Sequence, residues 1–367
     1  MGGSTDTHAG FATVAVVRTL HDQHRISFAS DNIAGAHPDV LAALSLAAGG
    51  HVGAYGEDPY TAEFSAVATR LFGAGTHAFP VLSGTGANVL ALASATPRWG
   101  AVVVPAEAHT MTDEAGAPEH AAGLKLIPID TADGKLHPAD IAAAAADLGN
   151  QHHAQPTTVS IADVTERGTL YTADELAALA DAAHAHGMLL HLDGSRLANA
   201  AAALDVSLSA LTSEVGVDVL SLGATKNGAL FAEAVVVLPG APGWLARAVL
   251  MSRKGHLQLA SKLRFVSAQL LAMYEGELWR DNAAHANAMA ARLHAGLSGI
   301  PGVGFAYPVE ANAVFAVLPG EVEALRERFD FHGEGTHESP ARLMCAFDTP
   351  AEAVDELIAA VRAGHTR

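Results

Sequence analysis

Lys226 is the residue of this sequence best suited to act as a nucleophilic amine. It lies in the segment SLGATKNG at 221–228, between two apolar runs at 217–220 and 234–238 that predict strands. A lysine at such a turn loses water contacts, and this lowers the pKa of its ammonium group towards the neutral amine. A neutral amine forms a Schiff base with an aldehyde. The alternative is a lysine that extends from a strand end into solvent.

An aspartate after a second apolar stretch favours the chemical interpretation. Residues 188–192 read MLLHL and are followed directly by Asp193. A lysine can hold the aldehyde of pyridoxal 5'-phosphate (PLP), and an aspartate can keep its pyridine nitrogen protonated so that the ring accepts electrons. The chain has five lysines, and Lys226 is the one in an apolar setting. The two stretches together therefore predict a PLP site.

A glycine-rich turn is a candidate binding site for the cofactor phosphate. The segment SGTGAN at 83–88 lies between a predicted strand at 78–82 and a predicted helix at 87–95. Glycines allow the backbone to approach an anion, and a helix N-terminus offers free N–H groups and a positive dipole end. The turn lacks the lysine of a P-loop and the full GxGxxG spacing, which argues against a nucleotide. Thr225 is a further donor to the phosphate.

Three more residues are expected near the same crevice. His109 follows a predicted strand at 101–104 and should emerge at the sheet edge where ligands bind, with its imidazole stacked on a ring. The alternative is a histidine in a surface loop. Arg196 and Arg342 are candidate clamps for a substrate carboxylate, because guanidinium matches carboxylate with two parallel hydrogen bonds. For Arg342 the alternative is a solvated charge at a strand end.

Composition limits the class of protein. The 367 residues fit one large domain and a smaller one, and a net charge of −18 argues against nucleic acid or acidic membranes as partners. We expect small molecules and further copies of the chain as partners instead.

The single cysteine, Cys345, excludes an internal disulfide and suits a reducing compartment. No bilayer-spanning stretch and no signal peptide is apparent, which predicts a cytoplasmic protein. The 20 histidines show no zinc-type spacing, so no metal is expected.

Alternating strands and helices predict an α/β fold with a mostly parallel central sheet and helices on both faces. After about Pro239 the pattern changes to a long helical stretch up to about Leu297, followed by short strands and helices of a smaller C-terminal α+β domain. The predicted domains are an N-terminal arm (1–26), a large PLP-binding domain (27–240) and a small C-terminal domain (241–367). The predicted strands are 78–82, 101–104, 124–129, 157–163, 188–192, 217–220, 234–238, 303–307, 313–318 and 342–347, and the predicted helices include 39–48, 59–72, 87–95, 138–147 and 173–186.

From about Ser27 to the C-terminus the sequence resembles the PLP-dependent threonine aldolases. These belong to the β-eliminating lyase group of fold-type I enzymes, and the likeness is greatest to the low-specificity and phenylserine aldolases. Each matching stretch is weak alone, but their order and number make the resemblance specific. The stretches are 30–32, 55–58, 83–88, His109 with 114–116, 191–196 and 223–228.

The resemblance implies a role for each candidate residue. Members of the family build each site at a subunit interface, so a homodimer or homotetramer with shared sites is implied. For the cofactor, the resemblance implies that Lys226 forms a Schiff base with PLP, Asp193 pairs with the pyridine nitrogen, His109 stacks on the ring, and Gly84 and Thr85 bind the phosphate. For the substrate, it implies that Arg196 contacts the ring oxygen and the substrate carboxylate, and that Ser30 and Arg342 complete the carboxylate site. Arg264 is implied to contact the neighbouring subunit's phosphate.

The implied activity is the reversible cleavage of L-β-hydroxy-α-amino acids, namely threonine, allo-threonine and phenylserine, to glycine and an aldehyde. Asp113 stands where many relatives have tyrosine, and 165–168 (TERG) stands where many have a histidine near the β-hydroxyl group. Both departures resemble the phenylserine branch, and they leave His109 to remove the hydroxyl proton, directly or through water. The alternatives are transamination, β-elimination, or PLP binding without turnover. The intact set of lysine, aspartate and arginines argues against the last.

Overall fold

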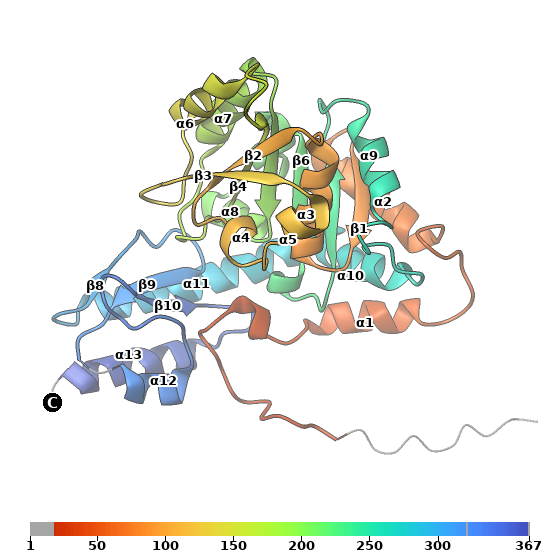
Figure 1. The fold of residues 1–367 in the computed structure, drawn as a ribbon. Coiled ribbons are helices and arrows are strands. Elements are labelled where there is room, and N and C mark those ends of the chain that lie inside the picture. Colours follow the sequence, from red (N-terminus) through yellow and green to blue (C-terminus); the bar gives the residue numbers. More distant parts are fainter. Residues whose placement is uncertain (1–17, 321, 366–367) are drawn as a thin grey trace, which may run out of the picture.

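The computed structural model describes residues 18–320 and 322–365, which form a large sheet with helices and a smaller C-terminal sheet (Figure 1). The large sheet has seven strands in the order β1-β7-β6-β5-β4-β2-β3. β7 runs antiparallel to both of its neighbours, and every other pairing in this sheet is parallel. The predicted mostly parallel sheet is thus confirmed. Its strands are β1 His77–Val81, β2 Gly100–Pro105, β3 Lys125–Ile129, β4 Gln155–Ala162, β5 Leu189–Gly194, β6 Val219–Gly223 and β7 Glu233–Val237.

Helices cover both faces of this sheet because its central strands are apolar on both sides. Within β6, Val219 packs into the cluster under α3 and α9, whereas Leu220 joins the main core on the opposite face. Side chains of a strand alternate between faces, so two buried neighbours require two covering layers. The first layer contains α3 Gly84–Ala95, α5 Ala117–Ala122 and α9 Leu245–Ser252, and the second contains α1 Pro38–Ala47, α2 Pro59–Phe72, α6 Pro138–Ala144, α7 Ala173–Ala185, α8 Leu197–Leu204 and α10 Arg264–Tyr274.

Polar caps fix where the helices begin. Thr172 accepts a hydrogen bond from the backbone N–H of Glu175 at 3.2 Å, and the Glu175 carboxylate accepts the Thr172 N–H at 2.8 Å. This capping box starts α7 as the sequence predicts. Ser83 caps α3 in the same manner, through the N–H of Gly86 at 3.1 Å.

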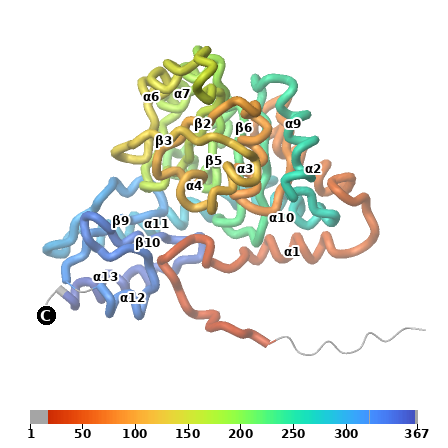
Figure 2. The backbone as a smooth tube through the Cα atoms, viewed as in Figure 1, coloured from red at the N-terminus to blue at the C-terminus, as the bar shows by residue number. Residues whose placement is uncertain are grey.

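The smaller unit is built on an antiparallel sheet in the order β10-β9-β8. Its core also receives Phe28, whose carbonyl accepts the Met344 N–H at 2.8 Å. Figure 2 shows that the segment before α1 lies against this C-terminal part, although the two are far apart in sequence. The elements are α11 Leu278–Ser298, β8 Gly304–Phe305, β9 Ala313–Val317, α12 Glu323–Phe329, β10 Ala341–Met344 and α13 Ala351–His365.

The predicted long helical stretch up to about Leu297 is divided into α9, α10 and α11. The chain leaves helix between α9 and α10, where Leu257 has a φ of +63°, and it turns again between α10 and α11. α10 packs on α1 and α2, and a straight helix continuing from α9 could not reach both. Within α11, Ala283 belongs to the main core, whereas Ala290 belongs to the core of the smaller unit. α11 therefore contributes to both cores, and the domain boundary at 240/241 stays a prediction.

The predicted arm at 1–26 lies mostly outside the described residues, which begin at residue 18. The described part of it, 18–26, contains neither helix nor strand. No helix in the described ranges has the length and apolar character needed to cross a bilayer.

Candidate active site

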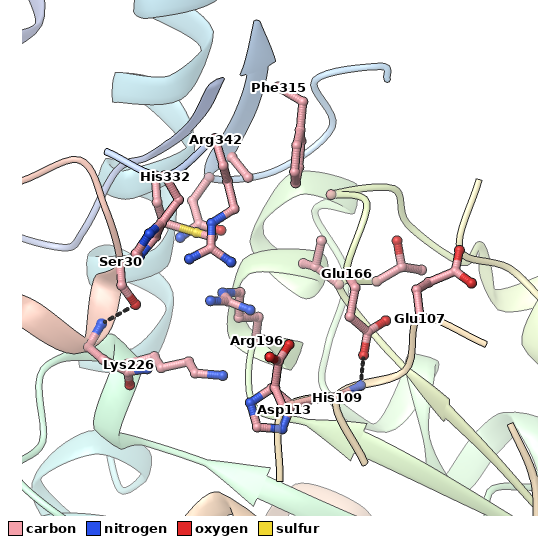
Figure 3. A pocket seen from close by; sticks show the side chains of 17 residues that line it. Ser30, Glu107, His109, Asp113, Glu166, Arg196, Lys226, Phe315, His332 and Arg342 are labelled. Carbon is pink, nitrogen blue, oxygen red and sulfur yellow. Dashed lines mark hydrogen bonds between the residues drawn. The ribbon is translucent and has the colours of Figure 1, made fainter. Parts of the chain in front are cut away.

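A cavity of about 470 Å³ lies between the carboxyl edge of the large sheet and the small sheet (Figure 3). Parallel strands end at the same edge, so side chains that follow β2, β4, β5 and β6 meet there. β9 and β10 supply the opposite wall. Of the residues predicted from the sequence, those that line the cavity are Ser30, His109, Arg196, Lys226 and Arg342.

Lys226 lies in a 3-10 turn, Thr225–Asn227, directly after β6. Its Nζ donates to the hydroxyl of Ser195 at 3.2 Å and faces the cavity. Burial, and then the charge of Arg196, lower the pKa of Lys226 below its ordinary value. The backbone of the turn is held by Glu233, whose carboxylate accepts the Ala224 N–H at 3.0 Å. These are the surroundings that a Schiff-base lysine requires.

Asp193 is buried at the end of β5, close to Lys226 but outside the cavity wall. Its two carboxylate oxygens accept the Asn88 amide at 2.7 Å and the Ser195 N–H at 2.9 Å. Burial alone would raise the pKa of Asp193, but the charge of Lys226 and these hydrogen bonds hold it below its usual range. Asp193 is therefore an ionised carboxylate, as pairing with a pyridinium nitrogen requires.

His109 begins the short helix α4, His109–Thr112, and is held by a buried partner. Its Nδ1 lies 2.9 Å from Oε1 of Glu114, and this hydrogen bond raises the pKa of the imidazole. The same Glu114 oxygen accepts the Asn88 amide at 2.9 Å. Because that amide also binds Asp193, one chain of hydrogen bonds fixes the orientation of both His109 and Asp193.

The two arginines of the cavity differ in whether a carboxylate pairs with the guanidinium. Arg196 binds Asp31 through two hydrogen bonds of 2.6 and 2.8 Å, so its charge is already neutralised. Arg342 donates to the carbonyl of Ala29 at 3.0 Å and forms no ion pair with any described residue. Its Nε is buried without a partner, and burial lowers the pKa of the guanidinium. Among the described residues Arg342 thus has no carboxylate within ion-pair distance, although the charges of Asp31 and Asp113 act on it.

The residues predicted for the phosphate lie outside the cavity wall. Gly84 begins α3, and a side chain placed there would meet nothing within 4 Å, which leaves the turn open to a ligand. Thr85 is the next residue of this first turn. The hydroxyl of Thr225 accepts the Ala232 N–H at 3.2 Å. Arg264 donates to the carbonyls of Gly49 and Gly50 at a separate hollow, and one chain does not bring it to the cavity.

Several residues that line the cavity were not predicted from the sequence, among them Glu107, Glu166, Phe315 and His332. Alternation along β9 would have indicated Phe315, because Ala313 and Phe315 share one face of that strand. Nothing in the local pattern distinguished the two glutamates from surface charges. Asp113 and Thr165, the two positions that depart from many relatives, also line the cavity.

Comparison with known proteins decides the family. The sequence model of the β-eliminating lyases matches residues 27–320. The chain belongs to the β-eliminating lyase family. A low specificity L-threonine aldolase of Pseudomonas aeruginosa is 40% identical over 345 residues, which are 92% of this chain and 98% of the relative. One from another Pseudomonas strain is also 40% identical, over 92% of this chain and 97% of its own length.

A solved threonine aldolase of Leishmania major superposes with a TM-score of 0.85 at 29% identity, covering 92% of this chain and 99% of that one. The fold-type I architecture predicted from the sequence is thereby confirmed. β-Eliminating lyases of this kind depend on PLP, which confirms the predicted cofactor. The donor set fits it, because a desolvated lysine and an ionised, buried aspartate lie beside an open helix N-terminus. Among the described residues, no group of three His, Cys, Asp or Glu side chains is arranged to hold a metal ion.

Proposed function

We propose that this β-eliminating lyase cleaves L-β-hydroxy-α-amino acids reversibly to glycine and an aldehyde, with threonine, allo-threonine and phenylserine as substrates. The observation that carries the proposal is that one cavity contains both the desolvated Lys226 and Arg342, which forms no ion pair with any described residue. The likeness to two low specificity L-threonine aldolases over nearly the whole chain supports the same reaction.

The large sheet would hold the cofactor. In this proposal Lys226 binds the aldehyde carbon, Asp193 the ring nitrogen, and the first turn of α3 at Gly84 and Thr85 the phosphate. His109 stacks on the ring, and Thr225 is a further phosphate donor. PLP bound there supplies an electron sink for the pair left on Cα when the Cα–Cβ bond breaks. The ionised state of Asp193 keeps that sink effective, because it favours a protonated ring nitrogen.

The substrate would be oriented by its carboxylate. Arg342 is proposed as the main clamp, since its guanidinium has no anionic partner in the described structure. Arg196 is fixed by Asp31 and supplies hydrogen bonds from a rigid position, with Ser30 completing the site. A carboxylate held in this way limits rotation of the substrate and so selects the bond that breaks.

We also propose a homodimer or homotetramer with shared active sites in the cytoplasm. Val52 is 41% exposed and lines the hollow that contains Lys262 and Arg264. Tyr55, 48% exposed, donates its N–H to the carbonyl of Ser261 in the wall of this hollow at 3.0 Å. Exposed apolar side chains of this size favour burial against another subunit. Arg264 would then be available to the neighbour's cofactor phosphate. The buried, unpaired Cys345 suits a reducing compartment.

Product analysis tests the reaction. Purified protein with PLP is incubated with threonine and, separately, with phenylserine, and we expect glycine with acetaldehyde or benzaldehyde in equal amounts. Transamination would convert the substrate to an oxo acid and need an acceptor, and β-elimination would release ammonia. Either outcome without glycine would replace the proposed aldol cleavage by that reaction.

A further inference from the structure

We propose that Glu166 is the catalytic residue that accepts the proton of the substrate's β-hydroxyl group. The inference rests on the proposed aldol cleavage and assigns a step that the sequence alone gave to His109. It follows from the contacts of the Glu166 carboxylate, from the state of the other cavity groups and from the partial burial of this side chain.

The Glu166 carboxylate has one engaged oxygen and one free oxygen. Oε1 accepts the backbone N–H of His109 at 2.7 Å, which fixes the side chain on the cavity wall (Figure 3). Oε2 is shielded from solvent and has no hydrogen-bond partner among the described residues. A buried acceptor without a donor costs about 1–3 kcal/mol. A hydroxyl group of a bound substrate would be such a donor.

The position relative to Arg342 suits this role. Glu166 enters from the loop after β4, and Arg342 enters from β10 on the opposite wall (Figure 3). A substrate whose carboxylate is bound by Arg342 can therefore direct its other end towards Glu166. Val164 and Phe315 line the cavity as well and offer an apolar surface to the substituent on Cβ.

The other proton acceptors of the cavity are less suited. Glu107 accepts hydrogen bonds from Thr131 at 2.7 Å and from Arg167 at 3.3 Å, so its charge is already paired. His109 is bound to Glu114, and this hydrogen bond raises the pKa of the imidazole and favours its protonated form. Asp113 and His332, the remaining acceptors, are exposed to solvent.

Burial raises the pKa of Glu166 to about 7. The nearby charge of Asp193 acts in the same direction, whereas the hydrogen bond from His109 opposes it. The charge of His109 also lowers this pKa, and Arg196 is a further charged group that interacts with the carboxyl. A base with a pKa near neutrality is both available as carboxylate and strong enough to take a proton. The ordinary pKa of an exposed glutamate would make it a much weaker base.

The hydroxyl proton passes to Oε2 of Glu166, and the electron pair of the O–H bond becomes the second bond of the aldehyde C=O. The Cα–Cβ bond breaks, and its pair stays on the Cα side. A proton from solvent added at Cα completes glycine, and Glu166 releases its proton to solvent before the next turnover. In the reverse direction Glu166 returns its proton to the newly formed hydroxyl group.

Glu166→Gln tests the assignment because glutamine keeps an oxygen for the His109 N–H but cannot take the proton. We expect kcat for threonine and phenylserine cleavage to fall at least about 100-fold. Exchange of the glycine α-proton with solvent deuterium, followed by NMR, needs the cofactor and Lys226 but no β-hydroxyl group. In Glu166→Gln the rate of this exchange should change less than about threefold, and the visible cofactor absorbance should be unchanged.

A matched control is Glu107→Gln, which removes a carboxylate charge from the same cavity wall but one already paired. Its kcat should fall less than about tenfold. The wild-type enzyme should lose kcat/KM for cleavage as the pH falls below about 7, because Glu166 must be deprotonated, and Glu166→Gln should lack this dependence.

Three results would overturn the proposal: undiminished cleavage by Glu166→Gln, loss of cleavage and glycine exchange together, or a wild-type profile without the decrease near pH 7. The second would give Glu166 a purely structural role next to His109. Failure of the proposed function is recognised separately, because then the wild-type protein would exchange glycine protons but cleave neither substrate.

Discussion

Replacement of Arg342 by alanine should weaken substrate binding without releasing the cofactor. Arg342 lies on β10 of the small sheet, and among the described residues its guanidinium donates a hydrogen bond only to the Ala29 carbonyl. A carboxylate that binds such a cation gains charge-assisted hydrogen bonds, which contribute about 1.5–3 kcal/mol net. Since about 1.4 kcal/mol corresponds to tenfold, KM for threonine should rise about 10- to 150-fold.

The size of the effect depends on the lack of an anionic partner for Arg342. Arg167 offers a matched control, because it lies near the same cavity but is paired with Glu107 at 3.3 Å and packs over the Tyr307 ring at 5.0 Å. Arg167→Ala should change KM less than about threefold. Initial rates over a range of threonine concentrations give KM and kcat, and kcat should change little if the carboxylate is bound equally well in the transition state.

The visible absorbance of the Arg342→Ala protein provides the second readout. None of the proposed cofactor contacts lies on the small sheet that carries Arg342, so the absorbance should match the wild type at equal protein concentration. An unchanged KM would remove Arg342 from the carboxylate site. Loss of the cofactor together with the substrate would indicate that Arg342 supports the fold around the cavity.

Three further predictions follow from the same geometry. The purified protein should be yellow, and Lys226→Ala should abolish the absorbance that borohydride otherwise traps; labelling of Lys254 or Lys262 instead would contradict the assignment. Sedimentation should give a dimer or a dimer of dimers, whereas a fully active monomer would refute shared sites. Phenylserine should be cleaved with a kcat/KM at least about tenfold above that of threonine, a difference of roughly 1.4 kcal/mol, because an aryl aldehyde gains conjugation and Val164 and Phe315 line the cavity. Steady-state rates with both substrates check this, and a clear preference for threonine would be the contrary result.

The sheet and the lysine turn were predictable because their signals are local. The apolar runs on each side of Lys226 and the glycines within the turn act over a few residues, and the structure places the turn at the end of β6. The capping box at Thr172 and Glu175 likewise contains its own partners. Short-range hydrogen bonds and side-chain alternation do not depend on the remainder of the chain.

The environments of Glu166 and Leu257 were not predictable, because each depends on distant residues. Glu166 is held by the backbone of His109, which lies 57 positions earlier, and nothing near Glu166 in sequence distinguishes it from Glu107. At Leu257 the leucines and alanines on both sides favour helix, but α10 must turn to pack on α1 and α2. Tertiary packing then overrides the local preference.

The cavity is bounded by two sheets, and this separates cofactor binding from substrate choice, two properties on which selection acts. The cofactor contacts proposed here come from the large sheet and α3, whereas Phe315 and Arg342 project from β9 and β10. Substitutions on β9 and β10 can therefore alter which amino acid is accepted while the protein keeps its colour. A library randomised at the face of β9 that carries Ala313 and Phe315 could be sorted first for yellow colonies and then for new aldehydes. The fold thus permits the substrate range to diversify without rebuilding the catalytic cofactor site.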